Sequence, residues 1–131
     1  MKEEYIMKKI KGVLVINGEI KEYELECNSY KDYYKILNCD TFDIQTRKFG
    51  DEWLDIYCDD DGLFRENNEP SVLTFANGKL VEQIVGNVFI VNHDDEGETI
   101  SLTDEQIKKV METVTVVIYK LKKLKVLQAT I

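Results

Sequence analysis

The sequence lacks the short motifs by which many enzymes are identified. It contains no GxSxG, no glycine-rich phosphate loop, no HExxH and no paired CxxC. It also shows no paired acid and base or activated nucleophile of the kind that phosphodiester or glycosidic chemistry requires. We therefore predict that this protein is not an enzyme and needs no cofactor.

Histidine and cysteine are scarce, with one histidine and three cysteines in the chain. Cys27, Cys39 and Cys58 are odd in number and widely spaced, which is typical of a reducing cytoplasm rather than of a disulfide framework. Together with His93 they could complete a Cys₃His zinc site, but structural zinc ligands usually come in close pairs. We predict buried, unreactive thiols and no metal site.

Long apolar runs are also missing. No stretch approaches the roughly 18 apolar residues that a membrane-spanning helix needs. The opening segment MKEEYIMKKIKG mixes charges with single apolar residues and has no hydrophobic region of a secretory leader. These features predict a cytoplasmic protein without membrane contact.

Basic residues are outnumbered. The chain has 17 Lys and Arg against 25 Asp and Glu, a net charge of −8 at pH 7. Such a charge disfavours direct binding to nucleic acid, which needs clustered lysines and arginines. The acids concentrate in residues 51–69, whereas lysines dominate from Lys108 to Lys125. The sequence predicts an acidic middle and a basic C-terminal segment.

The patterns that are present predict a single α+β domain over residues 1–131, a mainly antiparallel sheet of hairpins with a short helix and a longer C-terminal helix. Residues 12–16 and 20–26 read as strands joined at Asn17-Gly18, a favoured hairpin dipeptide. A short helix follows over 29–37, with Asn28 or Ser29 as its N-cap.

A second hairpin is predicted around Gly50. With Gly50 at the centre of a three-residue turn, Ile44 faces Ile56 and Arg47 faces Trp53 across the strands. The apolar residues expected on one, core-facing side are Phe42, Ile44, Leu54, Ile56 and Cys58.

The other side of this hairpin alternates carboxylates with aromatic rings. The stripe consists of Asp51, Trp53, Asp55, Tyr57 and Asp59. It could stack a base or ring, or imitate a phosphate backbone, because strand residues two apart lie roughly 6.5–7 Å from one another. Alternatively, Trp53 and Tyr57 pack beneath a helix and the acids lie at the rim.

Residues 62–79 are predicted to form a long loop, because they contain Pro70, the only proline, and Asn77-Gly78. A third hairpin runs from Val85 to Val91, turns at 94–97 and returns through Ile100. Its tip resembles the start of a calcium loop, but Thr103 stands where the bidentate glutamate belongs.

The last predicted element is a helix over residues 103–126. Thr103 and Gln106 form a capping box, and an apolar heptad seam from Ile107 to Leu124 contains no glycine or proline. The β-branched run TVTVVIY would also suit a strand. The exposed seam predicts a homo-oligomer, which Glu substitutions at Val117 and Leu121 should dissociate.

Several segments, in this order, resemble a small domain of unknown function common in phages, prophages and Gram-positive bacteria such as Firmicutes. They are KGVLVING, then DIYCDDDGLF followed by Asn67, Asn68 and Pro70, then IVGNVFIVNHDDEGETISLTDEQIKK. The resemblance covers about residues 11–112. It is strongest in the last segment, where an acidic tip ending in Gly97 precedes the start of a helix.

That family is similar in fold to the phage anti-Thoeris proteins, sponges that sequester the cyclic ADP-ribose signal of TIR-domain immune sensors without degrading it. The resemblance implies a phage-type anti-defence protein, in the host cytoplasm if phage-encoded, that holds a cyclic nucleotide between the protomers of an oligomer. Two segments depart from the pattern. Asn38-Cys39-Asp40 replaces a Gly-rich turn, and residues 66–79 differ from the usual Pro-Asn-Arg type.

A sponge needs aromatic plates for a base, amides for ribose and base edges, and a cation for pyrophosphate. The candidate ligand-binding residues are Phe64, Arg65, Asn67, Asn68, Phe75, Asn87 and Asn92. Each asparagine could instead serve a turn. Two other classes of function stay open: an acidic inhibitor of a host nucleic-acid-binding protein, of DNA-mimic or anti-CRISPR type, acting through residues 51–69, and a partner-binding module that uses the C-terminal heptads.

Overall fold

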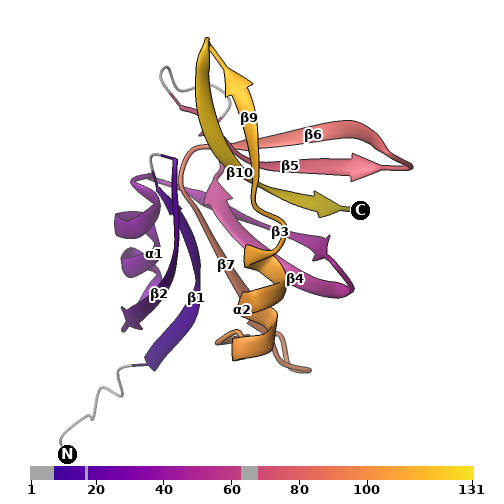
Figure 1. The fold of residues 1–131 in the computed structure, drawn as a ribbon. Helices are drawn as coiled ribbons and strands as arrows, with labels where there is room; N and C mark the ends of the chain where they lie inside the picture. The colour runs from indigo at the N-terminus through magenta and orange to yellow at the C-terminus, as the bar shows by residue number, and fades with distance from the viewer. Residues whose placement is uncertain (1–7, 17, 63–67) are drawn as a thin grey trace, which may run out of the picture.

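The computed structural model describes residues 8–16, 18–62 and 68–131. Within these ranges the chain forms one sheet-rich domain with two short helices (Figure 1). The strands are β1 (Lys8–Ile16), β2 (Glu19–Cys27), β3 (Phe42–Phe49), β4 (Glu52–Asp59), β5 (Pro70–Ala76), β6 (Lys79–Val85), β7 (Val88–His93), β8 (Thr99–Ile100), β9 (Thr115–Tyr119) and β10 (Lys122–Thr130). The helices are α1 (Tyr30–Leu37) and α2 (Asp104–Met111), and neither is long and apolar enough to cross a membrane.

The strands join in the order β2-β1-β7-β4-β3-β10-β5-β6, with β8 added to β7 and β9 to β10. The described pairs are antiparallel except β10 and β5, in which Leu127 to Thr130 run parallel to Val72 to Phe75. The last strand of the chain therefore lies inside the sheet, between β3 and β5. The mainly antiparallel sheet agrees with the predicted fold class.

The first predicted hairpin is confirmed by β1 and β2, which pair from Lys8 with Cys27 to Ile16 with Glu19. Gly12 is required in β1 for a further reason. A Cβ atom at Gly12 would lie 2.2 Å from the carbonyl oxygen of Ile90 on β7, so only glycine allows the two backbones to approach this closely.

Both helices begin where their capping residues predict. Ser29 caps α1 and accepts a hydrogen bond from the Lys31 backbone, and Asn38 ends the helix in the left-handed conformation with φ of 52°. Thr103 and Gln106 form the predicted capping box at the start of α2. The helix expected over 29–37 is therefore confirmed, as is the start of the second helix.

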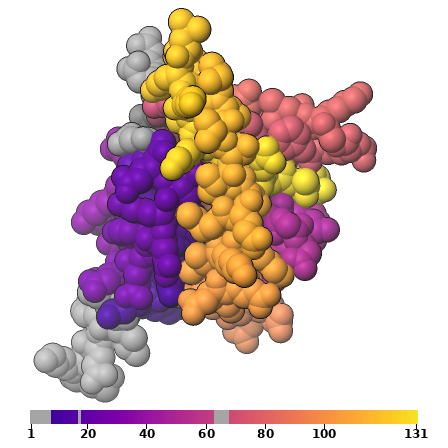
Figure 2. All heavy atoms as spheres, viewed as in Figure 1, coloured from indigo at the N-terminus to yellow at the C-terminus, as the bar shows by residue number. Residues whose placement is uncertain are grey.

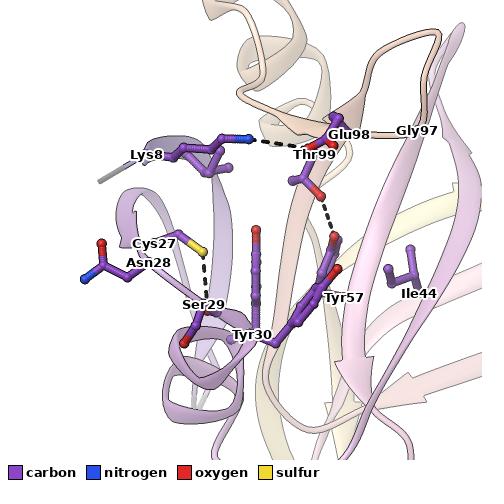
Figure 3. A pocket seen from close by; sticks show the side chains of 12 residues that line it. Lys8, Cys27, Asn28, Ser29, Tyr30, Ile44, Tyr57, Gly97, Glu98 and Thr99 are labelled. Carbon is purple, nitrogen blue, oxygen red and sulfur yellow. Dashed lines mark hydrogen bonds and ion pairs between the residues drawn. The ribbon is translucent and has the colours of Figure 1, made fainter. Parts of the chain in front are cut away.

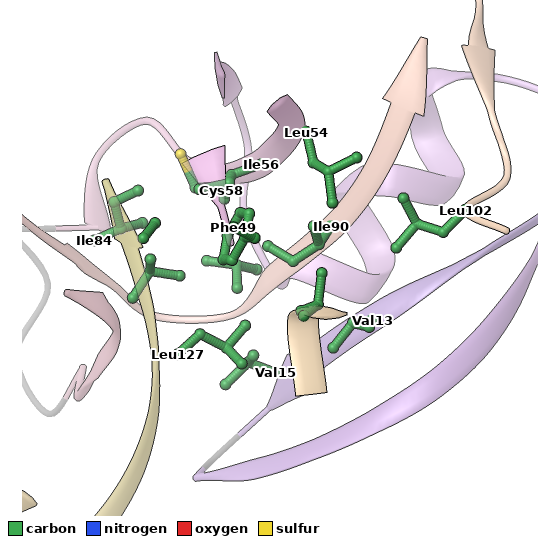
Figure 4. Packing of buried hydrophobic residues seen from close by; sticks show 14 of the residues in the cluster. Val13, Val15, Phe49, Leu54, Ile56, Cys58, Ile84, Ile90, Leu102 and Leu127 are labelled. Carbon is green, nitrogen blue, oxygen red and sulfur yellow. The ribbon is translucent and has the colours of Figure 1, made fainter. Parts of the chain in front are cut away.

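The two helices cover opposite faces of the sheet. The α2 face is an aliphatic core that contains fully buried Val13, Leu54 and Ile56 and reaches Val110 of α2 (Figure 4). The α1 face is smaller and more aromatic, with Tyr33 of α1 packed against Tyr57 and its neighbours. Alternation along each strand separates the two sets of side chains.

The prediction of a long C-terminal helix is wrong. Helix α2 ends at Met111, and residues 115–130 form the hairpin β9–β10, which projects from the body in Figures 1 and 2. Its turn is made by Lys120 and Leu121, both with positive φ, at 48° and 67°. The β-branched residues of β9 favour a strand, and that preference outweighs the apolar heptad spacing.

The predicted loop over 62–79 is also wrong in its second half. Residues 70–85 form the hairpin β5–β6, and Asn77-Gly78 is its tight turn, with φ of 52° and 77°. Val85 ends β6 and does not belong to the following strand, which begins at Val88. The tip at 94–97 and the return through Ile100 are confirmed, because Asn92 pairs with Ile100.

The second hairpin has a different register from the predicted one. Phe49 pairs with Glu52 around a two-residue turn, so Ile44 faces Tyr57, and Arg47 faces Leu54 instead of Trp53. A shift of one residue moves the side chains of one strand to the other face. Ile44 therefore lies on the side of Tyr57 and not on the side of Leu54 and the core.

This register also carries Phe42 to the Tyr57 side, away from Leu54, Ile56 and Cys58. The Arg47 guanidinium forms a two-nitrogen contact with the Glu82 carboxylate, at 3.0 and 3.1 Å, in place of the expected contact with Trp53. The predicted cation–π pair is therefore wrong.

The acidic and aromatic stripe on β4 is not an exposed row. Asp55, Tyr57 and Asp59 are buried, at 6%, 4% and 8% exposure, whereas Trp53 is 52% exposed. Asp51 forms an ion pair with Lys109 of α2 at 2.8 Å. The alternative that Trp53 and Tyr57 pack beneath a helix is therefore correct for Tyr57 and wrong for Trp53.

Candidate functional site

A cleft of about 590 Å³ opens on the α1 side of the sheet (Figure 3). Its walls come from the start of β1, the β2–α1 connection, α1, the adjacent strands β3 and β4, and the tip between β7 and β8. The volume falls in the range of roughly 300–1,000 Å³ typical of sites for small molecules. The cleft is therefore the main candidate for a functional site.

Aromatic rings form the floor of the cleft. Tyr33 of α1 stacks on Tyr57 of β4, with ring centroids 4.6 Å apart and 22° between the planes. Phe42 of β3 also stacks on Tyr57 at 5.3 Å. Tyr30, one helical turn before Tyr33, touches Phe42 at 6.2 Å but is 70% exposed. The partly buried Phe42 ring, itself stacked on Tyr57, holds Tyr30 at the cleft while most of the Tyr30 surface stays accessible to a ligand.

Two opposite charges meet across the mouth of the cleft. Lys8 Nζ lies 3.4 Å from Glu98 Oε2, and both side chains are more than half exposed (Figure 3). An exposed pair of this kind contributes about 0–1 kcal/mol, so little free energy opposes its separation. Lys8 is thus well placed to meet an anionic group of a ligand.

A row of polar side chains leads from the cleft along the sheet. The Tyr57 hydroxyl forms a hydrogen bond with the Thr99 hydroxyl, and Thr99 pairs with His93 across β7 and β8. His93 Nδ1 lies 2.7 Å from Asp55 Oδ2, and the other Asp55 oxygen accepts a 2.8 Å hydrogen bond from Thr46. A buried carboxylate therefore fixes the orientation of a histidine whose side chain is 45% exposed.

The tyrosines of the cleft are neutral hydrogen-bonding groups. Burial raises the pKa of Tyr33 and of Tyr57 above the ordinary tyrosine value. Both hydroxyls therefore keep their protons at neutral pH. An aromatic floor with neutral hydroxyls and a cation at the rim suits a ligand that has a planar ring and a polar or anionic group.

Of the seven residues predicted from the sequence as ligand contacts, four belong to the described part of the chain. Phe64, Arg65 and Asn67 fall outside the described residues. Asn68, Asn87, Phe75 and Asn92 are described, and none of these four lines the cleft.

Two of these four lie close together beside Gly86. Asn68 Nδ2 donates to the Gly62 carbonyl at 3.0 Å and lies 3.1 Å from the position that a Cβ of Gly86 would take. Asn87 Nδ2 donates to the Ile36 carbonyl at 3.3 Å, next to the end of α1. The Asn68 amide thus binds a backbone group of its own connection, as the turn-serving alternative expects, whereas the Asn87 amide ties the start of β7 to the distant end of α1.

The other two lie on separate strands. Phe75 is in β5, opposite Thr130 of β10, and Asn92 Oδ1 accepts a 2.8 Å hydrogen bond from the backbone of His93. The structure therefore brings Asn68 and Asn87 together but not Phe75 or Asn92. The roles of these four residues in ligand binding stay predictions.

Sequence reasoning misses the residues that line the cleft. A usable signal is the density of tyrosine in and beside the first helix, where Tyr30 and Tyr33 lie one turn apart. Lys8 and Thr99 offer no such signal, because only the folded sheet brings the start of β1 near the β7–β8 tip.

The cysteines do not gather at the cleft. Cys58 is buried in the aliphatic core, as predicted, whereas Cys27, which lines the cleft, and Cys39 are only partly buried beside the aromatic side. The prediction of buried thiols is therefore wrong for these two. Within the described ranges, no three side chains of His, Cys, Asp or Glu form a group that could hold a metal ion.

The fold and the cleft together define a sheet-rich α+β domain. Its aromatic-lined cleft lies between the short helix α1 and the tip that connects β7 and β8. The chain belongs to the family described as Domain of unknown function (DUF3846), whose model matches residues 8–115. No curated protein and no solved structure matches it. The expected relation to a small domain of unknown function is confirmed, and the match ends where β9 begins.

Proposed function

We propose that this protein binds a small nucleotide-like ligand in the α1 cleft and holds it without cleaving it. The observation that carries the proposal is the exposed ring of Tyr30 above a buried aromatic stack, in a cleft of about 590 Å³. Stacking of a base on an aromatic side chain contributes about 1–3 kcal/mol. The other lining groups then provide orientation and specificity.

The polar groups of the cleft are arranged for such a ligand. Lys8 lies at the mouth and suits a phosphate, while Asn28 and Ser29 at the start of α1 offer an amide and a hydroxyl for ribose or base edges. Among the described residues that line the cleft, Glu98 is the acidic side chain, and it opposes an anion. Because its contact with Lys8 is exposed, a ligand phosphate can replace the Glu98 carboxylate at little cost.

Cyclic ADP-ribose and its isomers are the first ligands that we propose, and the protein then acts as a phage-type anti-defence sponge. The specific ligand comes from the sequence resemblance, and the aromatic cleft supports the broader ligand class. The alternative of an acidic inhibitor has less support. Asp55 and Asp59 are buried, so β4 offers no continuous acidic row to a nucleic-acid-binding protein.

The binding test uses calorimetry with cyclic ADP-ribose, its isomers, AMP and adenosine. Tyr30→Ala should weaken binding about 5- to 150-fold, which is the equivalent of 1–3 kcal/mol. Trp53→Ala is the matched control, because it also removes a largely exposed aromatic ring but one that does not line the cleft. Equal losses of affinity in the two variants, or no binding of any nucleotide to the unmodified protein, would contradict the proposal.

The same sample tests whether the ligand survives. Heat denaturation after binding should release intact nucleotide, identified by mass spectrometry. The oriented Asp55–His93 pair is the arrangement in which enzymes hold a general base, so His93→Ala belongs in this test. Release of a cleaved product that disappears in His93→Ala would replace sequestration by catalysis.

Arg65→Ala tests the part of the proposal that rests on sequence alone. A guanidinium matches phosphate oxygens in a bidentate geometry, so its removal should lower the affinity for a phosphorylated ligand but not for adenosine. If the variant binds the phosphorylated ligand as tightly as the unmodified protein does, Arg65 is excluded from the site.

A further inference from the structure

Strand β9 has an exposed edge that carries no protection against pairing. Among the described strands it pairs only with β10. Its five residues, TVVIY, include no charge, no proline and no bulge, the devices by which proteins usually block a free edge. Val116 and Ile118 are 55% and 69% exposed, and Leu121 in the adjoining turn is 99% exposed.

The backbone of β9 has unused hydrogen-bonding groups at this edge. In an antiparallel pair, every second residue exchanges hydrogen bonds with its partner strand. Gln128 N donates to Thr113 O at 3.2 Å, and Lys122 pairs with Tyr119 beside the turn, so odd-numbered residues bond to β10. The N–H and C=O groups of Val116 and Ile118 therefore point away from β10.

We propose that β9 pairs with β9 of a second copy of this chain in antiparallel orientation about a two-fold axis at Val117. This alignment sets Val116 of each copy opposite Ile118 of the other, so the outward backbone groups form four hydrogen bonds. The four β-branched side chains then lie together on one face. A two-fold interface requires such a self-complementary segment.

The charges of the hairpin fit this alignment. No charged side chain lies within β9, and the lysines are placed in the turn and in β10. The same alignment brings the turn of each copy level with the end of α2 in the other. Leu121 in that turn, which is 99% exposed, is then level with residues 113 and 114 of the other copy, which link α2 to β9.

The proposed pairing is independent of the ligand site. Lys8 at the start of β1 lines the α1 cleft, whereas Gly18 beyond the end of β1 lies beside residues 122–125 of the hairpin. Figures 1 and 2 show the hairpin projecting beyond the body of the molecule, where a second copy has access to its edge. Pairing therefore leaves both clefts of the dimer open.

Cysteine cross-linking tests the register. Residues at the two-fold axis form a pair with Cα atoms about 4.5 Å apart, within the range that a disulfide spans. Val117→Cys should give a reducible dimer on mild oxidation. Thr115→Cys is the matched control, because the two copies of residue 115 are then about 13 Å apart. The unmodified protein shows how much cross-linking its own cysteines give. Equal cross-linking of the Val117→Cys and Thr115→Cys variants would overturn the proposal.

Sedimentation velocity tests the pairing itself. The unmodified protein should form a concentration-dependent dimer, and Ile118→Pro should be a monomer because proline removes the outward N–H. Ile118→Val, which keeps the N–H, should remain dimeric. A monomeric unmodified protein, or a dimer that persists in a folded Ile118→Pro, would overturn the proposal. If Ile118→Pro does not fold, the cross-linking result decides.

Discussion

The two faces of the sheet are covered by helices of equal length, yet one face is closed and the other is open. On the α2 side, Val13, Leu54 and Val110 are fully buried, at 0% exposure. On the α1 side, Tyr33 is 4% exposed but Tyr30 and Ile44 are 70% and 46% exposed. Aliphatic side chains interlock into a dry core, whereas tyrosine rings end in hydroxyls that favour contact with water or a ligand.

The comparison indicates that the α2 face carries most of the stability, whereas the α1 face offers the proposed binding site. The closed face holds most of the buried aliphatic side chains, and the open face holds the cleft. Substitutions of buried residues on the α2 side should therefore destabilise the protein, while substitutions of the exposed residues Tyr30 and Ile44 on the α1 side should leave the fold intact.

The largest expected effect is at Leu54. Leu54→Ala should lower the free energy of unfolding by about 2–5 kcal/mol, because it opens a cavity in a fully buried site. Ile44→Ala on the neighbouring strand is the matched control, with an expected loss below about 1 kcal/mol because this side chain is 46% exposed. Urea denaturation measures both, and equal losses would contradict the division between the faces.

A smaller effect is expected at the Tyr57 hydroxyl. Tyr57→Phe removes the hydrogen bond to Thr99 and should cost about 0.5–1.5 kcal/mol of unfolding free energy. Thr99→Val and the double variant complete a double-mutant cycle. Additive losses in the double variant would show that the two hydroxyls do not interact in solution.

Thiol reactivity gives a third comparison, with little effect on stability. Burial raises the pKa of the Cys58 thiol to about 12, so only about one molecule in ten thousand carries the thiolate at pH 8. Iodoacetamide should therefore modify Cys27, which lines the cleft, and leave Cys58 intact until denaturant is added. Peptide mass spectrometry distinguishes the sites, and equal labelling of both in the folded protein would contradict the closed core.

The smallest expected effect concerns the attachment of α2 to the β3–β4 turn. The hydrogen bond from Lys109 lowers the pKa of the Asp51 carboxyl below its ordinary value. The contribution of Asp51 to stability is therefore present above its unfolded pKa and is lost as the pH falls through the folded pKa, in the region below about pH 4.

Melting temperatures between pH 5 and about 2 measure this loss. Asp51→Asn should remove the corresponding part of the pH dependence and leave the melting temperature above pH 5 slightly lower. Because Asp51 is exposed and Lys109 is partly exposed, the difference should be small and should decrease with added salt. An identical pH dependence in the variant would contradict a role for this pair.

The sequence predicts those elements whose signals are local. The capping boxes at Ser29 and Thr103 fix where both helices begin, and the Asn17-Gly18 dipeptide predicts the first hairpin. The end of α2 has no such signal. The β9–β10 turn uses Lys120 and Leu121 in left-handed conformations that usually require glycine or asparagine, so nothing in the sequence marks it.

The candidate site could be predicted only in part, because it is made by register and topology. One residue of register in the β3–β4 hairpin decides whether Ile44 faces the core or the cleft. Thr99 reaches Tyr57 only because β7 lies beside β4 and folds back as β8. Neither relation follows from spacing along the chain.

The position of β10 between β3 and β5 has a consequence for folding during synthesis. The hairpin β5–β6 is joined to the rest of the hydrogen-bonded sheet through β10, whose pairing residues are Leu127 to Thr130. During synthesis, β5 and β6 therefore gain a neighbouring strand only after residues 127–130 have left the ribosome. Until then one hydrogen-bonding edge of β5 has no neighbouring strand, and closure of the sheet depends on residues 127–130.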